Sequence, residues 1–226
     1  MRAVAVIPAR SGSTRVKNKN FRESRFGSLV EIALKDAQAA GFFSEIILST
    51  DSDSGKYLAE IYSATFHQRS VEASSDTATA TDVLLDLKVC FKEIGVRPDD
   101  FLFYLQPTSP FRTPALLRYA WNDICAAQRL GLVTVSPVDS KYAKLMVVTN
   151  GDVSPVMGEE VATANQQAGK QVFLANGNIF AFRWGHFLHR SVFPLSGLRA
   201  LVQGEVDSLD IDSETDFELF EKSYVP

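Results

Sequence analysis

Hydrophobic and polar positions alternate along this chain with two periodicities, one typical of strands and one typical of helices. Residues 2–8 form an apolar run of high β propensity, and residues 28–40 form an amphipathic segment that Gly41 ends as a helix stop. The succession continues with strands predicted over 45–50 and 101–105, and helices over 54–64, 79–94 and 114–129. Alternating strands and helices favour an α/β fold, with a mostly parallel sheet covered on both faces and ligands at the carboxyl ends of its strands.

The pattern of predicted elements changes over residues 136–193, where short strand-like segments such as 145–149 and 179–182 are separated by turns. Residues 150–152, Asn-Gly-Asp, predict a hairpin turn. Residues 206–224 then predict a strand-like run, an acidic turn and a helix capped by Ser213. No linker or repeat divides the chain, so we expect one domain over 1–226 with an excursion at about 136–193 that serves as a subdomain or dimerisation arm.

The composition fits one sizeable globular domain: 226 residues, 46% hydrophobic, with a net charge of −4. A mildly acidic chain is a poor candidate for nonspecific nucleic-acid binding. Cys90 and Cys125 lie in predicted helices, where reduced core cysteines suit a cytoplasmic compartment. The sequence shows no apolar run long enough to cross a bilayer, so we expect a cytoplasmic protein that binds neither nucleic acid nor membrane.

The loop after the first strand combines small side chains with a concentration of positive charge. Ala9, Ser11, Gly12 and Ser13 would let backbone N–H groups approach an anion. The cations are Arg10, Arg15, Lys17, Lys19, Arg22 and Arg25, opposed in that stretch by Glu23 alone. The loop matches neither the P-loop nor the Gly-x-Gly-x-x-Gly pattern. It indicates either a different polyphosphate site or an ordinary solvated basic loop.

Two carboxylates stand together in Asp210-Ile211-Asp212. On an extended strand, alternation would place both on the same face, within reach of one Mg²⁺ ion. A solvated turn is the alternative, because Asp-x-Asp also arises by chance, as in Asp51-Ser52-Asp53.

A buried strand stops abruptly at residues 106–112, Gln-Pro-Thr-Ser-Pro-Phe-Arg. The two prolines fix the backbone and display Gln106, Thr108 and Ser109, as in a substrate-orienting loop. The same segment also works as a strand-to-helix connector, with Thr113 as N-cap and Pro114 at the first helical position.

Histidine chemistry is not indicated. His186 and His189 could share a helix face, but no third metal ligand accompanies them and their neighbours are apolar. No recognisable Ser-His-Asp or Cys-His spacing predicts covalent catalysis.

Taken in order, six motifs resemble the acylneuraminate cytidylyltransferases, or CMP-sialic acid synthetases, over nearly the whole chain. The motifs are residues 7–10 with Lys19-Asn20, 49–51, 75–79, 105–110, 176–180 and 210–212. The resemblance implies a Rossmann-like nucleotidyltransferase fold and a homodimer whose arm reaches the partner's active site. It also implies the reaction of CTP with a nonulosonic acid, which yields CMP-sugar and pyrophosphate with Mg²⁺ as cofactor.

The resemblance also implies roles for single residues. Arg10, Lys19 and the loop residues Ala9, Ser11, Gly12, Ser13 and Arg15 would hold the triphosphate, Asn20 the ribose side, and Arg69, Ala78 and Thr79 the cytosine. Gln106, Thr108, Ser109, Lys144, Gln166, Asn176 and Phe193 would face the sugar, and Asp210 and Asp212 would bind the metal. Lys19, Arg10 and Asp212 would carry catalysis, with Asp212, a metal-bound hydroxide or Gln106 as alternatives for handling the attacking hydroxyl.

The chain departs from the family pattern at three places. Ser11-Gly12-Ser13-Thr14 replaces Gly-Gly-Ser-Lys, so that Arg15 stands where it could replace the missing lysine charge; Asn165 replaces an arginine, and Asn178 an alanine. Ser13-Thr14-Arg15 also resembles the Kdo cytidylyltransferases, although the later motifs differ from theirs. A glycosyltransferase and a catalytically inactive nucleotide-binding homologue are further alternatives, and sialic, legionaminic and pseudaminic acids all remain possible substrates.

Overall fold

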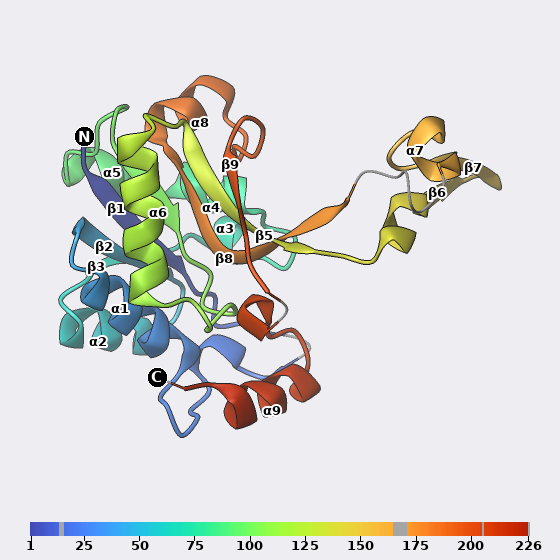
Figure 1. Cartoon of the computed structure of the whole chain (residues 1–226). Helices are drawn as coiled ribbons and strands as arrows, with labels where there is room; N and C mark the ends of the chain where they lie inside the picture. The colour runs from blue at the N-terminus through green and yellow to red at the C-terminus, as the bar shows by residue number, and fades with distance from the viewer. Residues whose placement is uncertain (14–15, 165–170, 205, 226) are drawn as a thin grey trace.

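The computed structural model describes residues 1–13, 16–164, 171–204 and 206–225. Within them, seven strands form one sheet in the order β3-β2-β1-β4-β8-β5-β9 (Figure 1). The strands are β1 (Ala3–Pro8), β2 (Phe43–Thr50), β3 (Thr65–Gln68), β4 (Phe101–Tyr104), β5 (Gly131–Pro137), β8 (Phe173–Arg183) and β9 (Arg199–Val202). All neighbours are parallel except where β8 pairs with β4 and β5. The expected α/β fold with a mostly parallel sheet is confirmed.

Helices cover both faces of the sheet. On one face lie α1 (Leu29–Ala40), α2 (Asp53–Ile61) and α6 (Pro114–Ala126), and on the other α4 (Ala80–Asp86), α5 (Lys88–Glu93) and α8 (Trp184–Arg190). Strand β1 serves both cores, since Ala5 and Ile7 pack into the first and Val4 and Val6 into the second. None of the helices in the described residues is long and apolar enough to span a membrane.

Local sequence signals place the helix ends. Helix α1 begins at a capping box in which the Ser28 hydroxyl accepts from the Glu31 N–H and the Glu31 carboxylate accepts from the Ser28 N–H. It ends at Gly41, whose φ of 75° is the left-handed conformation that glycine adopts at low cost. Thr113 caps α6 with Pro114 at its first position. These three ends confirm the helix boundaries expected from the sequence.

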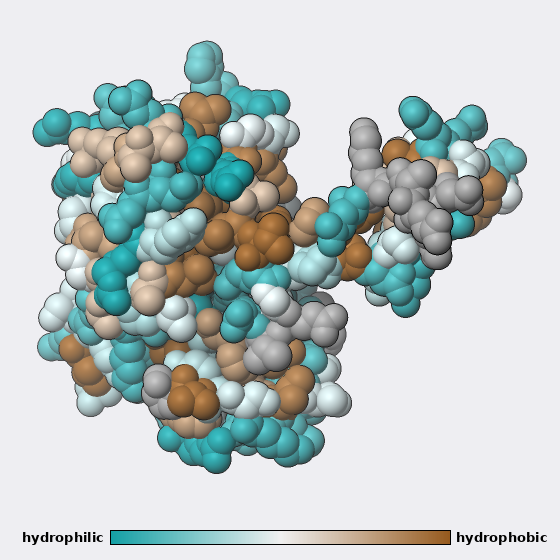
Figure 2. Space-filling model, in the orientation of Figure 1, coloured by the Kyte–Doolittle hydropathy of each residue, from teal (hydrophilic) through white to brown (hydrophobic). Residues whose placement is uncertain are grey.

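An arm projects from the body between β5 and β8 (Figure 1). It contains η2 (Ser140–Lys144), β6 (Met146–Thr149), β7 (Asp152–Pro155) and α7 (Glu159–Thr163). Its hairpin turns at Asn150 and Gly151, with φ of 54° and 93°, which confirms the turn expected there. The arm stands clear of the body in Figure 2. The excursion expected at about 136–193 is therefore wider than the projecting part, because β8 and α8 belong to the body.

Four other expectations were wrong in detail. The helix expected over 79–94 is divided at Leu87 into α4 and α5. The short strands β3 and β9 were not expected. The run from residue 206 forms a 3-10 turn, η3 (Val206–Ser208), rather than a strand, and residues 209–212 have no regular structure. After them comes α9 (Glu214–Ser223), capped by Ser213 as expected.

Candidate active site

A pocket of about 290 Å³ lies where β1 and β4 end, which is the position expected for a ligand in an α/β sheet. Loops from distant parts of the sequence line it. The predicted site residues that it brings together are Arg10, Gly12, Ser13, Lys19, Asn20, Arg69, Ala78, Thr79, Gln106, Thr108 and Asp212.

The loop after β1 is anchored by Asp51, at the end of β2. One carboxylate oxygen of Asp51 accepts the Ser11 N–H and the other accepts the Ser11 hydroxyl, both at 2.7 Å. The Asn20 amide donates to the Arg10 carbonyl at 3.1 Å and so ties the two ends of the loop together. Sequence reasoning included Asp51 in one of the family motifs but gave it no role of its own, although its place directly after a strand could have indicated this one.

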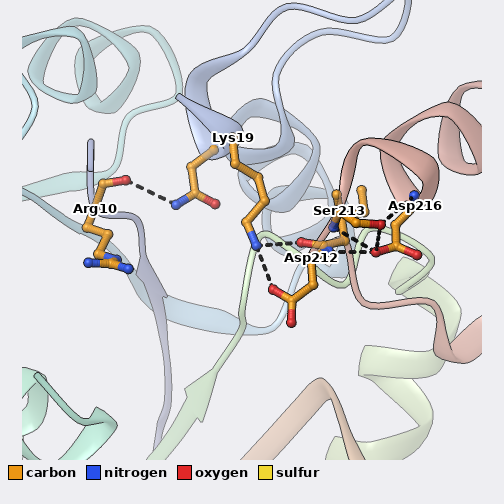
Figure 3. A network of polar contacts seen from close by, with 7 residues as sticks. Arg10, Lys19, Asp212, Ser213 and Asp216 are labelled. Carbon is orange, nitrogen blue, oxygen red and sulfur yellow. Dashed lines mark hydrogen bonds and ion pairs between the residues drawn. The ribbon is translucent and has the colours of Figure 1, made fainter. Parts of the chain in front are cut away.

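The cations of the pocket are paired with acids from later in the chain. Lys19 Nζ lies 2.9 Å from Asp212 Oδ1 and also donates to the Ile211 carbonyl, as Figure 3 shows. Arg10 forms an ion pair with Asp76, in the turn before α4. These pairs hold two positive side chains at the pocket, where a polyphosphate would meet them.

The acidic segment is held by its backbone rather than by a strand. The Ile211 N–H donates to the Thr108 carbonyl at 2.8 Å, and the Ile211 side chain is fully buried in an apolar cluster with residues of α1 and α9. Asp216 accepts from the backbone N–H groups of Asp212 and Ser213, at 3.1 and 2.7 Å (Figure 3). The carboxylates of Asp210 and Asp212 thus flank one buried residue, although no strand places them there.

The two acids interact electrostatically. Although Asp210 is exposed at the surface, partial desolvation by the neighbouring protein raises the pKa of its carboxyl; a hydrogen bond from Thr108 opposes this rise, and the neighbouring charge of Asp212 adds to it. No cluster of three or more His, Cys, Asp or Glu side chains suited to a metal occurs in the described residues. Two neighbouring carboxylates fit Mg²⁺, which in nucleotide sites takes one or two protein carboxylates and completes its shell with phosphates and water.

The loop after β4 is clamped against β8. The Ser109 hydroxyl donates to the Asn176 carbonyl at 3.1 Å, and Ser109 is completely buried. Gly177 has a φ of 79°, and a Cβ there would come within 2.4 Å of the Gln106 side-chain oxygen and 2.6 Å of the Ser109 hydroxyl. The close approach of β8 to Gln106 therefore depends on this glycine.

Arg112 lies beneath the same loop as one of the largest fully buried side chains. Its Nη1 donates to the Asn178 carbonyl at 2.9 Å and to the Gln106 carbonyl at 3.3 Å. The charge of Asp36, on α1, acts on it from the other side, and burial raises the pKa of Asp36 to about 7 against the attraction of Arg112. Sequence reasoning did not identify Arg112, because nothing in its pattern distinguishes a buried arginine from an exposed one.

A second pocket, of about 320 Å³, adjoins the first and shares Thr79, Ala80, Tyr104 and Gln106 with it. Its other lining residues are Thr81, Ala175, Phe180, Phe193 and Leu195. None of the lining residues is charged, so this pocket suits a ligand with apolar groups.

Several predicted residues lie away from the pocket surfaces. Ala9 and Asn176 are buried, and the Asn176 amide donates to Ser136, Gln203 and Ser208 within the fold. Asn176 therefore supports the site from behind instead of lining it. Lys144 lies at the end of η2 on the arm. Arg15, Gln166 and the variant position Asn165 lie outside the described residues.

Comparisons with known proteins agree with this geometry. A family model described as cytidylyltransferase matches residues 4–222. The chain belongs to the cytidylyltransferase family. This cytidylyltransferase is 30% identical to the CMP-N,N'-diacetyllegionaminic acid synthase of Legionella pneumophila, over 98% of the chain and 96% of that relative. It is 28% identical to the N-acylneuraminate cytidylyltransferase of Escherichia coli O18:K1:H7, over 96% of the chain and 50% of that longer protein.

Solved structures support the fold of this cytidylyltransferase. A CMP-2-keto-3-deoxy-manno-octonic acid synthetase complexed with CTP superposes with a TM-score of 0.71 at 16% identity, covering 98% of each chain. A 4-diphosphocytidyl-2C-methyl-D-erythritol synthase superposes with a TM-score of 0.68 at 12% identity, again over 98% of each chain. The expected nucleotidyltransferase class and the resemblance to the acylneuraminate enzymes are confirmed.

Proposed function

We propose that this cytidylyltransferase joins CTP to a nonulosonic acid and releases CMP-sugar and pyrophosphate. The observation that carries the proposal is the meeting of two unlike pockets at Gln106. One is polar and is lined by Arg10, Lys19 and Asp212, and the other is apolar. A charged triphosphate and a sugar acid would then meet at the wall that the pockets share.

The residues of the polar pocket fit the charge changes of the transfer. The sugar hydroxyl oxygen would bond to the α-phosphorus of CTP and give up its proton to Asp212 or to water, while the bond from that phosphorus to the bridging oxygen of the β-phosphate breaks. Negative charge therefore develops on the departing pyrophosphate. Lys19 and Arg10 would bind these oxygens and stabilise that charge, as positioned cations do in phosphoryl transfer. Gln106 would orient the attacking hydroxyl from the shared wall.

Asp210 and Asp212 would hold Mg²⁺. The bound ion would supply charge neutralisation at the phosphate oxygens and so lower the barrier to their approach. Its ligation would require Asp212 to exchange part of its contact with Lys19, which lies 2.9 Å away and would then be available to the triphosphate.

The apolar pocket favours a particular kind of sugar. Phe180, Phe193 and Leu195 would pack against methyl groups, and none of the described residues that line the pocket carries a charge to bind a further ionic group. A nonulosonic acid that carries two N-acetyl groups matches these walls. We therefore propose an N,N'-diacetyllegionaminic acid type of substrate before a sialic acid.

The arm would complete the site from a second copy of the chain. Its exposed side chains include Val147, Val148 and Val153, an apolar surface that a homodimer would cover. Lys144 and Gln166 would then reach the sugar of the partner. The free cysteines Cys90 and Cys125 fit the reducing cytoplasm, where we place the reaction.

The test is pyrophosphate release from CTP and Mg²⁺, measured with N,N'-diacetyllegionaminic, N-acetylneuraminic, pseudaminic and Kdo acids in turn, with the product identified by mass. We expect the highest kcat/KM with the diacetylated legionaminic acid. Preference for N-acetylneuraminic acid or Kdo would overturn the substrate class, and CTP binding without turnover on any acid would overturn the activity.

A further inference from the structure

Hydrogen bonds behind the polar pocket join Arg69 to Ser49 and Ser49 to His67, and an electrostatic contact extends this series to Asp86. Arg69 lines the pocket and is only 6% exposed. Its Nη2 donates to the Ser49 carbonyl at 2.7 Å and its Nε donates to the Ser49 hydroxyl at 3.3 Å. The same hydroxyl lies 3.1 Å from His67 Nδ1, and His67 Nε2 lies 3.9 Å from an oxygen of Asp86.

Strand register explains why these groups meet. Ser49 on β2 pairs directly with His67 on the parallel strand β3, so their side chains leave the sheet on the same face. Arg69 is two residues after His67 and shares that face. Helix α4 covers it and carries Asp86 at its last position, where the Ser70 N–H fixes the carboxylate at 2.9 Å.

Chemistry assigns the hydrogen-bond donor in each of the contacts among Arg69, Ser49 and His67. A guanidinium only donates, so the Ser49 oxygen accepts from Arg69 and its own proton is free to donate. Asp86 faces His67 Nε2, and a carboxylate there favours the tautomer with the proton on Nε2. Nδ1 of His67 then carries a lone pair toward the Ser49 hydroxyl.

We propose that neutral His67, protonated at Nε2, is a positioning residue. Its Nδ1 accepts a hydrogen bond from the Ser49 hydroxyl and thereby holds the Arg69 guanidinium against the nucleotide. The inference rests on the proposed function and on the role that the family resemblance implies for Arg69, which is contact with the cytosine of CTP. Protonation of Nδ1 turns an acceptor into a donor facing the Ser49 hydroxyl and places a second cation beside Arg69. The nucleotide site should therefore bind CTP more weakly as His67 becomes charged.

The surroundings keep His67 neutral near neutral pH. Burial lowers the pKa of His67, with Asp86 opposing this shift and the Arg69 charge adding to it. The charged and titratable groups around Arg69 itself are Tyr104, Asp51, Asp86 and Arg10. We therefore expect the affinity for CTP to fall at mildly acidic pH, below the ordinary histidine pKa.

The first test is the imidazole nitrogen NMR spectrum of the full chain without nucleotide. The chain has three histidines, so His67 can be assigned with a His67→Gln variant, while His186 and His189 serve as internal references. We expect the Nε2–H tautomer for His67 and a pKa below the ordinary histidine value. An Nδ1–H tautomer would overturn the inference, whether or not CTP binds.

The second test is the dissociation constant of CTP measured by calorimetry from pH 8 to pH 5. The wild type should lose about three- to tenfold more affinity on acidification than His67→Gln, which cannot gain a proton. The triphosphate also titrates in this range, and the comparison between the two proteins removes that effect. His189→Gln, on the exposed end of α8, should follow the wild type.

Ser49→Ala removes the hydroxyl that links Arg69 to His67. It should bind CTP more weakly than wild type at pH 8 and should show the flatter pH profile of His67→Gln. Identical profiles for wild type, His67→Gln and Ser49→Ala would overturn the positioning role. No CTP binding by the wild type at pH 8 would instead overturn the proposed function, and the tautomer measurement would still decide the His67–Ser49 bond.

Discussion

Single residues of the site are paired with one another before any ligand arrives. Lys19 contacts Asp212, Arg10 contacts Asp76, and Ser11 contacts Asp51. Such pairs hold long side chains in fewer conformations, so less ordering remains to be done when a nucleotide binds. Substituting one member of a pair should therefore affect binding or turnover beyond the loss of that one contact.

Asp212→Asn should lower kcat by about 10²–10³-fold, because the amide neither carries the charge nor ligates a cation as a carboxylate does. Steady-state pyrophosphate release would measure this loss, and circular dichroism would show that the fold is retained. Glu214→Gln is the matched control, since Glu214 lies two residues later and forms an ion pair with Arg22, away from the Lys19 contact. A near-normal kcat for Asp212→Asn would remove Asp212 from the proposed site.

Asp51→Ala should raise the KM for CTP by about tenfold with a smaller change in kcat. The substitution removes both hydrogen bonds that shape the loop at Ser11, each worth about 1 kcal/mol when its partner is left unpaired. Asp53→Ala is the control, because Asp53 lies in the first turn of α2, in the same Asp-x-Asp motif, and makes no contact with the loop among the described hydrogen bonds. Equal KM values for the two variants would contradict the anchoring role.

The sequence predicted which segments form the site better than which side chains face it. The loop after β1, the segment after β4 and the residues near Asp212 were expected and do meet at one pocket. Ser109 and Asn176 were expected to face the sugar but are buried. Inside a strand, alternation tells which side chain faces outward, whereas in a loop the direction depends on tertiary hydrogen bonds, such as that of Ser109 to the Asn176 carbonyl.

Elements with a strong local pattern were predicted, and short ones were not. Helices α1 and α6 have both an apolar face and caps, and both ends of α1 and the start of α6 were predicted correctly. Helix α6 ends at Ala126, three residues before the predicted end. Strand β3 is only four residues long and reads Thr-Phe-His-Gln, which carries little apolar signal. It exists because it pairs with β2, a long-range contact that the local sequence does not encode.

Gly177→Ala tests the contact between two elements, β8 and the loop after β4. An alanine would have to adopt a positive φ and would also clash with Gln106 and Ser109, so we expect both a lower melting temperature and a kcat reduced at least tenfold. Gly151→Ala, at the hairpin of the arm, has a similarly positive φ of 93° and no atom within 4 Å of its Cβ. It should lose about 1 kcal/mol of stability from conformation alone, with kcat unchanged.

At the scale of the whole molecule, stability should depend on the protonation of buried Asp36. Its pKa of about 7 in the folded chain lies above the ordinary value of 3.8, so the folded state binds the proton more tightly than the unfolded state. The free energy of unfolding should therefore rise as pH falls from 8 to 6.5, by about 1 kcal/mol from this group. Denaturant titrations of wild type and Asp36→Asn would measure the difference.

The rise in the free energy of unfolding between pH 8 and pH 6.5 should be missing in Asp36→Asn. It should be present in Asp99→Asn, whose side chain is 84% exposed. A wild-type stability that changes by the same amount as that of Asp36→Asn would show that Asp36 is already charged when buried. The range ends at pH 6.5 because His67 acts in the opposite sense below it, since its lowered pKa makes the folded state the weaker proton binder.

The arm predicts the assembly state of the whole molecule. Wild type should sediment as a dimer, and Val148→Asp should shift it toward monomer, because a buried charge at a valine that is 67% exposed in the single chain would be left unpaired in the interface. Turnover should fall together with dimerisation. Val71→Asp, on the body and 84% exposed, is the control and should remain dimeric. A monomeric wild type with full activity would contradict the arm's proposed role.

Strand β8 also has a mechanical consequence. It is one element of 11 residues that begins at the arm and ends within the sheet, and its pairing with β5 shifts register between Ala175 and Phe180. Gly177, whose backbone closely approaches Gln106, lies in this irregular segment, and paired strands flank β8 farther along. The strand thus connects the arm to the pocket wall through the irregular segment at Gly177. A force that seats the arm on another surface reaches Gln106 through the backbone itself, without any intervening side chain.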